Sequence, residues 1–293
     1  MLPWSQLADT IGEMLLAFRN GKVRVPDRLH VDLANDGQLL VMPASDDEIA
    51  ITKLVSVHPD NGNRGLPTIQ GEVVVLDARD GRRLGILDGP AVTGRRTAAL
   101  SLLAVRKLAP VPGGKLLILG AGVQARSHLE AFHEGLDIGE VVISSRTEAR
   151  AKELAAHAGS LGLSARVAAD AAREAQDANL IVTATTSNEP LLAAPLHEGQ
   201  MVCAVGAFRP HMAELAPELV AACQVFVDDL AGVRAQGGDL IRAVDSGLWS
   251  WKQATPLVQA LDPENPEPAG PVLFKSVGHA LFDLAAARLA FLP

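Results

Sequence analysis

The chain has 293 residues and a formal net charge of −8 at pH 7, and 48% of its residues are hydrophobic. The length allows two domains with sizeable cores, and the composition is that of an ordinary globular α/β protein. The negative charge argues against a nucleic-acid partner, and no targeting segment or apolar run of membrane-spanning length is visible, so we expect a cytoplasmic protein without a membrane partner.

The first part of the chain is predicted to be rich in strands. Apolar residues at helical spacing between residues 5 and 18 predict an opening amphipathic helix. Asp80-Gly81 between two apolar segments is a strong hairpin signal. Several strands in so short a unit need covering, which a dimer formed through this part would supply. The predicted strands are 23–25, 29–33, 38–42, 49–57, 72–77 and 82–88.

An alanine-rich helix is predicted from Thr93 to Ala104, with Thr93 as its N-cap. Arg96 would then lie in the first turn, where a cation opposes the helix dipole unless an anion binds nearby. This misfit indicates that Arg95 or Arg96 contacts an anionic ligand. A solvated surface arginine remains the alternative.

The centre of the chain carries a glycine-rich turn between an apolar strand, 116–119, and a predicted helix. Gly120 permits a tight turn, Gly122 lets a pyrophosphate approach the backbone, and the small Ala125 allows close packing of helix on strand. The N–H groups at the helix start form an anion site. We interpret the turn as a dinucleotide-binding site rather than a purely structural connection.

The next strand, 140–143, ends in Ser144-Ser145-Arg146-Thr147 and lacks the acidic residue that would hold the ribose 2′-hydroxyl of NAD. A guanidinium with neighbouring hydroxyls suits a 2′-phosphate. We therefore expect NADPH, with NADH as a second option. The alternative is that Arg146 is a solvated loop residue.

Strands and alanine-rich helices then alternate, which predicts a doubly wound parallel sheet with its ligand at the carboxyl ends of the strands. The further strands are predicted at 180–183, 201–205 and 225–227. Residues 254–270 are predicted as a loop, and a last helix is expected to carry Val277, Leu281 and Leu284 on one face. The fold class is thus α/β, a Rossmann-like doubly wound parallel sheet, residues 111–274, inserted in a strand-rich α+β substrate-binding and dimerisation domain, residues 1–110 plus 275–293.

Other reactive side chains carry weaker signals. Cys203 and Cys223 lie in apolar runs and are expected to be buried thiols, not disulfide partners or metal ligands, and no metal site is expected. His58, His211 and His279 are candidates for proton transfer, although a structural or solvated role is favoured for each.

An ordered set of motifs over nearly the whole chain resembles the ornithine cyclodeaminase and mu-crystallin family. The motifs are Met42-Pro43-Ala44, Thr52-Lys53-Leu54-Val55, Gly65-Leu66-Pro67-Thr68, Asp88-Gly89 with Arg96-Thr97-Ala98-Ala99, Leu119-Gly120-Ala121-Gly122-Val123-Gln124-Ala125 and Phe274-Lys275-Ser276-Val277-Gly278. Each motif is weak alone, but their ordered combination is highly specific. The resemblance implies a homodimer built through the strand-rich domain.

The resemblance also implies site residues. Arg28, Lys53 and Arg96 match residues that hold the substrate carboxylate and its amino or imino group, and Val277 matches a position beside the substrate. Together with the glycine turn and the strand end, the cofactor-binding residues are Thr68, Gly120, Gly122, Val123, Gln124, Ala125, Ser145, Arg146, Thr147, Thr185, Val205 and Ser276.

Phe208 departs from the cyclodeaminase pattern. In the cyclodeaminases an aspartate matches this position and handles proton transfer at the substrate nitrogen, which a phenyl ring cannot do. The surrounding Gly-Ala-Phe segment instead looks like the reductase branch that acts on Δ1-pyrroline-2-carboxylate and Δ1-piperideine-2-carboxylate. The ring would pack against the apolar substrate ring, with simple core packing as the alternative.

The resemblance therefore implies NAD(P)H-dependent reduction of a cyclic imine to L-proline or L-pipecolate. Arg96 would clamp the carboxylate with help from Arg28, and Lys53 would be a second anion contact and a candidate proton donor. A protonated imine or a bound water would also serve as the proton source. Two alternatives stay open, an alanine-dehydrogenase-like or N-alkylamino-acid reductase and a non-catalytic NADPH-dependent protein that binds a small ligand.

Overall fold

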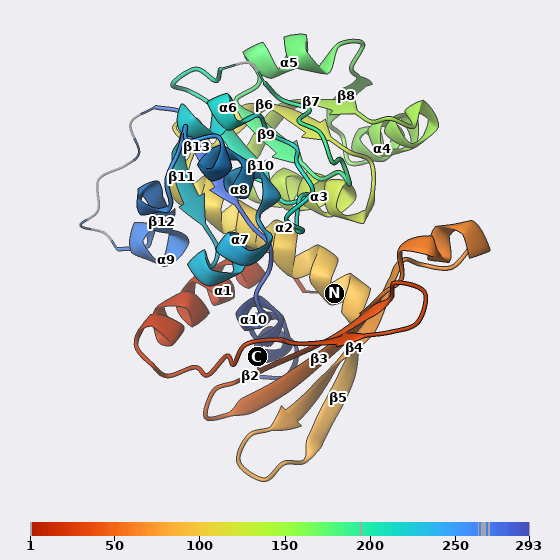
Figure 1. Cartoon of the computed structure of the whole chain (residues 1–293), viewed down its shortest axis with the longest axis vertical. Coiled ribbons are helices and arrows are strands. Elements are labelled where there is room, and N and C mark those ends of the chain that lie inside the picture. The colour runs from red at the N-terminus through yellow and green to blue at the C-terminus, as the bar shows by residue number, and fades with distance from the viewer. Residues whose placement is uncertain (1, 194, 263, 265–267, 269, 293) are drawn as a thin grey trace. The chain divides into compact units, whose positions relative to one another are not determined.

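The computed structural model describes residues 2–193, 195–262, 264, 268 and 270–292 (Figure 1). The chain divides into two compact units, Met1–Arg96 with His279–Pro293 (the first unit) and Thr97–Gly278 (the second unit). The predicted domain boundaries lie at residues 110 and 275, and the two compact units divide the chain between Arg96 and Thr97 and between Gly278 and His279. Arg96 and Thr97 belong to one continuous helix, Gly89–Leu108.

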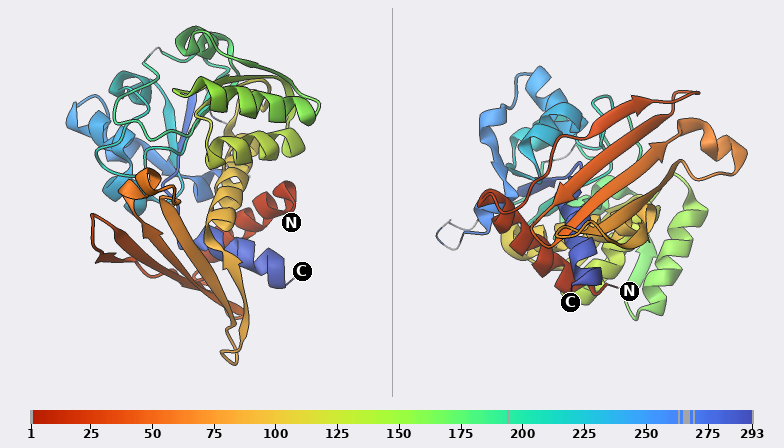
Figure 2. Two further views of the ribbon diagram at one scale, coloured as in Figure 1. Left: turned by 90° about the vertical axis from the view of Figure 1, so that its right-hand side faces the viewer. Right: turned by 90° about the horizontal axis from the view of Figure 1, so that it is seen from below.

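An antiparallel sheet with the strand order β1-β2-β3-β4-β5 forms most of the first unit. The elements of this unit are α1 Trp4–Arg19, β1 Leu29–Asp32, β2 Gln38–Ser45, β3 Ile49–Val57, the 3-10 helix η1 Pro59–Arg64, β4 Ile69–Asp77, β5 Arg83–Asp88 and α10 Ala280–Phe291. Helix α10 packs against α1, β2 and β3, on one side of the sheet (Figure 2). Side chains alternate between the faces of a strand, and Lys53 therefore shares the buried row of β3 with Ile51 and Val55.

The predicted helix and most predicted strands of the first unit are confirmed, including the hairpin at Asp80-Gly81, where Gly81 has a φ of 75°. Residues 23–25 are not a strand. Arg24 makes one isolated bridge with Ser45, and the following Pro26 has no N–H with which to extend the pairing.

Helix α2, Gly89–Leu108, begins one turn earlier than predicted. The carboxylate of Asp88 accepts a hydrogen bond from the N–H of Ala91 at 2.7 Å and caps the first turn. The Thr93 hydroxyl donates to the carbonyl of Gly89 one turn back, so Thr93 is not the N-cap. Arg96 consequently lies beyond the first turn, and the expected conflict with the helix dipole is wrong.

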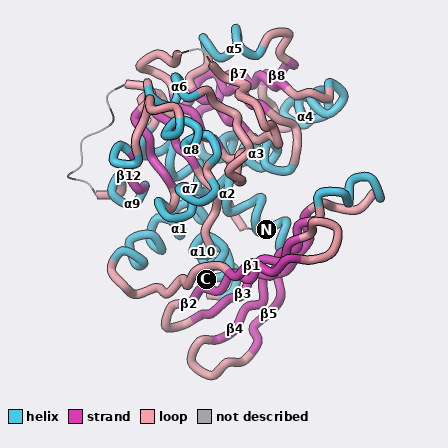
Figure 3. The backbone as a smooth tube through the Cα atoms, in the orientation of Figure 1, coloured by secondary structure: helices cyan, strands magenta, loops and turns pink. Residues whose placement is uncertain are grey.

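A parallel sheet forms the centre of the second unit (Figure 3). Its strand order is β12-β11-β13-β10-β9-β6-β7-β8. Its strands are β6 Gly113–Leu119, β7 Asp137–Ser144, β8 Ser164–Val167, β9 Leu180–Thr183, β10 Met201–Ala204, β11 Gln224–Val227, β12 Ala254–Pro256 and β13 Val272–Lys275. The strand order reverses between β6 and β9, which is the switch point of a Rossmann-like doubly wound sheet. The predicted fold class is confirmed.

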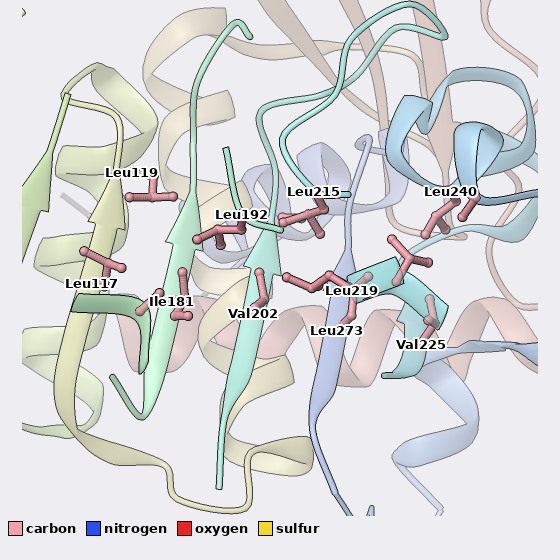
Figure 4. Packing of buried hydrophobic residues seen from close by; sticks show 14 of the residues in the cluster. Leu117, Leu119, Ile181, Leu192, Val202, Leu215, Leu219, Val225, Leu240 and Leu273 are labelled. Atoms are coloured by element: carbon pink, nitrogen blue, oxygen red, sulfur yellow. The ribbon is translucent and has the colours of Figure 1, made fainter. Parts of the chain in front are cut away.

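Helices connect these strands and cover the sheet. They are α3 Val123–Gly135, α4 Glu148–Ser160, α5 Ala171–Asp177, α6 Pro217–Ala221, α7 Leu230–Gln236, α8 Gly238–Asp245, the 3-10 helix η2 Trp251–Gln253 and α9 Leu257–Ala260. Side chains of adjacent strands, among them Leu117, Ile181, Val202 and Leu273, form a fully buried row against these helices (Figure 4). A sheet buried on both faces explains why its strands are continuous apolar runs in the sequence.

Three details of the second half differ from the sequence analysis. Strand β8 was not expected, because its polar residues carry no apolar run. The predicted loop 254–270 begins with β12 and α9, and residues 263, 265–267 and 269 of it lie outside the described residues. The last helix begins at Ala280, so Val277 precedes it rather than sharing its apolar face.

Candidate active site

The first unit buries a lysine beside a carboxylate. Lys53 Nζ lies 2.8 Å from Asp283 Oδ1 and 2.5 Å from Thr93 Oγ1. Asp283, in helix α10, is fully buried and Lys53 is 2% exposed. The pairing links strand β3 to two helices, because Thr93 belongs to α2 and Asp283 to α10.

Arg96 joins the same cluster. Its Nε lies 3.5 Å from Asp283 Oδ1, and the side chain is buried. Arg28, which precedes β1, is close enough for its charge to act on Lys53. Lys53 and Arg96 are thus two buried cations beside the carboxylate of Asp283, and the charge of Arg28 acts on the same lysine. We name these four residues the cationic cluster.

Burial lowers the pKa of Lys53 below its ordinary value, because it penalises the charged ammonium. The carboxylate of Asp283 acts in the opposite direction, and the positive charges of Arg96 and Arg28 lower the pKa further. A lysine whose pKa is lowered releases its proton more readily and can donate and regain it during a reaction.

Two buried atoms of the cluster have no hydrogen-bond partner among the described residues, the Nε of Arg96 and the Oδ2 of Asp283. Buried polar groups are normally paired, so each unsatisfied one calls for an explanation. An anionic group of a small ligand would supply an acceptor to Arg96 Nε, and an N–H of an amine product would supply a donor to Asp283 Oδ2.

The glycine turn of the second unit suits a dinucleotide. Gly120 has a φ of 119°, and a Cβ there would lie 2.4 Å from the carbonyl oxygen of Ala184. A Cβ at Gly122 would project into open space, and no side chain of the described residues caps the start of helix α3 there. The uncapped N–H groups and the room above Gly122 fit a pyrophosphate.

The other predicted cofactor residues of the second unit follow the carboxyl ends of parallel strands, which lie at one edge of the sheet. Val123 and Gln124 begin α3 after β6, Ser145, Arg146 and Thr147 follow β7, Thr185 follows β9, Val205 follows β10, and Ser276 follows β13. The predicted substrate residues Phe208 and Val277 follow β10 and β13. Arg146 and Val123 are exposed, whereas Ala125 is fully buried.

Thr68, the predicted cofactor residue of the first unit, lies directly before β4 and is exposed. Its carbonyl accepts a hydrogen bond from the N–H of His58.

Two of the histidines that were candidates for proton transfer make other contacts. The ring of His279 packs against the rings of Phe18 and Phe282. His211 is exposed, and its carbonyl accepts from Arg242. The Phe208 ring is half-buried beside the guanidinium of Arg209.

A buried carboxylate that was not predicted from the sequence binds the segments that follow β9 and β10. Oε1 of Glu214 accepts from the N–H and hydroxyl of Thr185, and Oε2 accepts from the Thr183 hydroxyl and the N–H groups of Gly206 and Ala207, at 2.7 to 3.2 Å. Burial raises the pKa of Glu214, and the charge of Lys275 opposes this. The five hydrogen bonds that the two Glu214 oxygens accept favour the ionised carboxylate, because hydrogen bonds to the charged form stabilise it.

Two further buried carboxylates support the same edge. Asp239 accepts from Lys275 Nζ at 2.7 Å and from the N–H groups of Glu214 and Leu215. Asp228 Oδ2 accepts from the Ser276 hydroxyl at 2.7 Å and from the N–H of Val277. Buried carboxylates therefore hydrogen-bond to the backbone of the segments that follow β10 and β13.

Sequence reasoning missed Asp283, Glu214, Asp239 and Asp228. The only signal available was an acidic residue inside a strongly apolar segment, as in Leu281-Phe282-Asp283-Leu284. Such a residue is rarely buried unless it is paired. No group of metal-binding side chains occurs among the described residues, and none of the helices there is long and apolar enough to cross a membrane.

Residues 2–291 match the model of the ornithine cyclodeaminase/mu-crystallin family. The Delta(1)-pyrroline-2-carboxylate reductase 1 of Burkholderia multivorans is 40% identical over 292 residues, which cover 99% of this chain and 91% of the relative. The ketimine reductase mu-crystallin of Rattus norvegicus is 34% identical over 276 residues, 93% and 86% of the two chains.

Solved structures are similar along the whole chain. The Delta(1)-pyrroline-2-carboxylate reductase of Thermococcus litoralis, in complex with NADH and L-proline, superposes with a TM-score of 0.92 at 28% identity and covers 99% of this chain and 93% of its own. An archaeal alanine dehydrogenase dimer with bound NAD has a TM-score of 0.90 at 27% identity, covering 99% and 91%.

Proposed function

The chain belongs to the ornithine cyclodeaminase/mu-crystallin family, and from this premise we propose that it is an NAD(P)H-dependent reductase of cyclic imines. It converts Δ1-pyrroline-2-carboxylate to L-proline, and Δ1-piperideine-2-carboxylate to L-pipecolate. The observation that carries the proposal is the cationic cluster, in which the buried cations Lys53 and Arg96 both lie beside the buried carboxylate of Asp283 and the charge of Arg28 acts on Lys53. The relative from Burkholderia multivorans, 40% identical, is named for the same reaction.

The cationic cluster selects a small carboxylate that carries a nitrogen. Arg96 binds the substrate carboxylate with its planar guanidinium, and Arg28 assists, because a guanidinium offers parallel N–H donors to two oxygens. Ligand binding then gives Nε of Arg96 the acceptor that this atom lacks among the described residues. Lys53 interacts with the substrate nitrogen.

The nicotinamide, when bound, supplies the hydride that reduces the imine carbon. The protein orients the imine and excludes water, which strengthens the interactions of the buried cations with the substrate. Lys53 gives a proton to the ring nitrogen and regains one from solvent after the product leaves. Phe208 packs against the apolar ring in this proposal and offers no acid or base at the substrate nitrogen, which disfavours cyclodeamination.

The second unit binds the cofactor through the glycine turn and the strand ends. Gly120, Gly122 and the start of α3 hold the pyrophosphate. Ser145, Arg146 and Thr147 favour NADPH over NADH, because a guanidinium with hydroxyl groups matches a 2′-phosphate. The support for a nicotinamide dinucleotide in general is broader, since similar structures contain NADH or NAD.

A homodimer forms through the face of the antiparallel sheet opposite α10. Leu29 on β1, Leu54 on β3 and Ile86 on β5 are exposed, and Leu29 and Leu54 are both in register with Val41 of β2, which puts them on one face. A second copy of this face would cover it. The similar archaeal alanine dehydrogenase is a dimer.

The experiment that tests the function is a steady-state comparison of substrates with NADPH and with NADH. The rate is measured from the loss of absorbance of the reduced cofactor. We expect kcat/KM for the five- and six-membered imine carboxylates to exceed that for pyruvate with ammonia or methylamine. Faster turnover of the open-chain substrates would instead make the protein an alanine-dehydrogenase-like or N-alkylamino-acid reductase. Tight NADPH-dependent binding without any turnover would make it a binding protein.

Arg96→Lys provides the matched variant, because it keeps the charge but loses the planar pair of donors. We expect kcat/KM for the imine to fall by about tenfold to a hundredfold, the loss of one or two charge-assisted hydrogen bonds. Binding of NADPH should change little, since its proposed contacts are elsewhere. Wild-type kinetics in Arg96→Lys would refute the carboxylate clamp.

A further inference from the structure

We propose that Asp283 is a positioning residue of this reaction, which acts with Thr93 to engage two of the three hydrogens of the Lys53 ammonium group and to reserve the third for the substrate nitrogen. The inference rests on the proposed imine reduction. It adds a residue that the sequence motifs did not include.

The hydrogen count around Lys53 follows from its two partners. An ammonium has three N–H donors and no acceptor. One donates to Asp283 Oδ1 at 2.8 Å. A second donates to Thr93 Oγ1 at 2.5 Å, and Thr93 must accept there because its own hydroxyl hydrogen goes to the carbonyl of Gly89. Within the described residues the third hydrogen is therefore left for a ligand.

This arrangement is suited to the loss of a single proton. As the hydride reaches the imine carbon, the C=N π pair becomes an N–H bond with the Lys53 proton, and the electrons of the broken N–H bond stay on Nζ. The cofactor is oxidised by two electrons and the imine is reduced by two. The resulting neutral amine retains two hydrogens, which match the two acceptors Asp283 and Thr93.

The charges around Lys53 decide whether its amine carries the proton that it would donate. The groups that face it are Asp283 from α10, Arg96 and Thr93 from α2, and Arg28 from the segment before β1. Burial and both arginines favour the neutral amine, and Asp283 is the only one of these charged groups that favours the ammonium. Without its carboxylate the ammonium would lose its proton at a lower pH.

The test is the pH profile of kcat/KM for Δ1-pyrroline-2-carboxylate in the full chain and in Asp283→Asn, which keeps the shape of the side chain. An opposite charge in contact moves a pKa by about 1 to 3 units. We therefore expect the midpoint of the basic limb to move to lower pH by about one unit or more. Asp77→Asn is the matched control, because Asp77 is a buried carboxylate of the same unit that pairs with Arg79. Its midpoint should be that of the wild type.

Asp283→Glu is the second variant, in case Asp283→Asn does not fold as judged by near-ultraviolet circular dichroism. It restores the charge on a longer arm. We expect its basic midpoint to stay within about half a unit of the wild type while kcat falls, because the lysine remains charged but is displaced. A basic midpoint in Asp283→Asn equal to that of the wild type would overturn the proposal. A midpoint in Asp283→Glu displaced as far as in Asp283→Asn would overturn it as well.

A measurement without turnover separates this inference from the proposed function. Selective 13C labelling of the lysine ε carbons, with Lys53→Arg to assign the signal, reports the titration of Lys53 by nuclear magnetic resonance. The Lys53 midpoint should be lower in Asp283→Asn than in the wild type, and equal midpoints would reject the role of Asp283. If the wild type reduced no cyclic imine while the titration shifted as expected, the proposed function would fail and the control of Lys53 by Asp283 would stand.

Discussion

The loop that carries Thr185 is hydrogen-bonded to the buried carboxylate of Glu214. Glu214→Gln measures how much this carboxylate contributes to stability and to cofactor binding. The two oxygens of Glu214 accept five hydrogen bonds, three of them from the backbone N–H groups of Thr185, Gly206 and Ala207. Glutamine has almost the same shape, but one of its two terminal atoms is an NH2 group that cannot accept.

The magnitude follows from the two orientations of the amide. With NH2 at the Oε1 position, the N–H of Thr185 loses its acceptor. With NH2 at the Oε2 position, Gly206 and Ala207 lose theirs. The hydroxyls of Thr183 and Thr185 can rotate to accept, so the smallest loss is one buried backbone N–H. This costs about 1–3 kcal/mol, a factor of about 5 to 150 in an equilibrium constant.

The assay combines stability and cofactor binding on the full chain. Urea unfolding, monitored by tryptophan fluorescence to which the buried Trp249 of the second unit contributes, should show an unfolding free energy lower by about 1–3 kcal/mol. The Kd for NADPH should rise several-fold, because the Thr185 loop is a proposed cofactor contact. Glu218→Gln, an exposed change on α6 nearby, is the control and should alter neither quantity. An unfolding free energy within about 0.5 kcal/mol of the wild type, with an unchanged Kd, would refute the reasoning.

The remaining predictions concern the second unit. Lys275→Met should lower the unfolding free energy by about 3–5 kcal/mol, because it leaves the fully buried Asp239 charged and unpaired; adding Asp239→Asn should recover part of this loss in urea unfolding, and an additive double variant would contradict the coupling. Burial lowers the pKa of His128 from 6.5 to about 4, so the unfolded chain binds a proton between these values while the folded chain does not, and stability should fall by about 3 kcal/mol as the pH drops through this window. His128→Gln should flatten that part of the pH dependence of the urea midpoint, and an equal slope in both proteins would show that another group is responsible. Arg146→Asp should lower the ratio of kcat/KM with NADPH to that with NADH by about tenfold to a hundredfold, and an unchanged ratio would remove the proposed 2′-phosphate contact.

Local patterns in the sequence were sufficient for most of the fold. The apolar runs that become β6, β9 and β10 are recognisable because a strand buried on both faces requires apolar residues at every position. Gly120 and Gly122 are recognisable because the turn needs a positive φ at one and open space at the other. Lys53 and Arg96 came from motifs, and the structure brings both to Asp283.

What the tertiary structure decided are the contacts between residues far apart in the chain. Asp283 meets Lys53 across 230 residues, and no periodicity in either segment indicates that α10 packs on β3 at this register. The start of α2 was also predicted wrongly. Asp88 and Thr93 are equally good N-caps by residue type, and only the structure shows that β5 ends at Asp88, whose carboxylate then caps the helix. The sequence by itself determines which segments become helices and strands, since periodicity and turn chemistry are local. Which carboxylate is buried against which cation is decided by packing, because only a folded core removes the water that would otherwise solvate each charge separately.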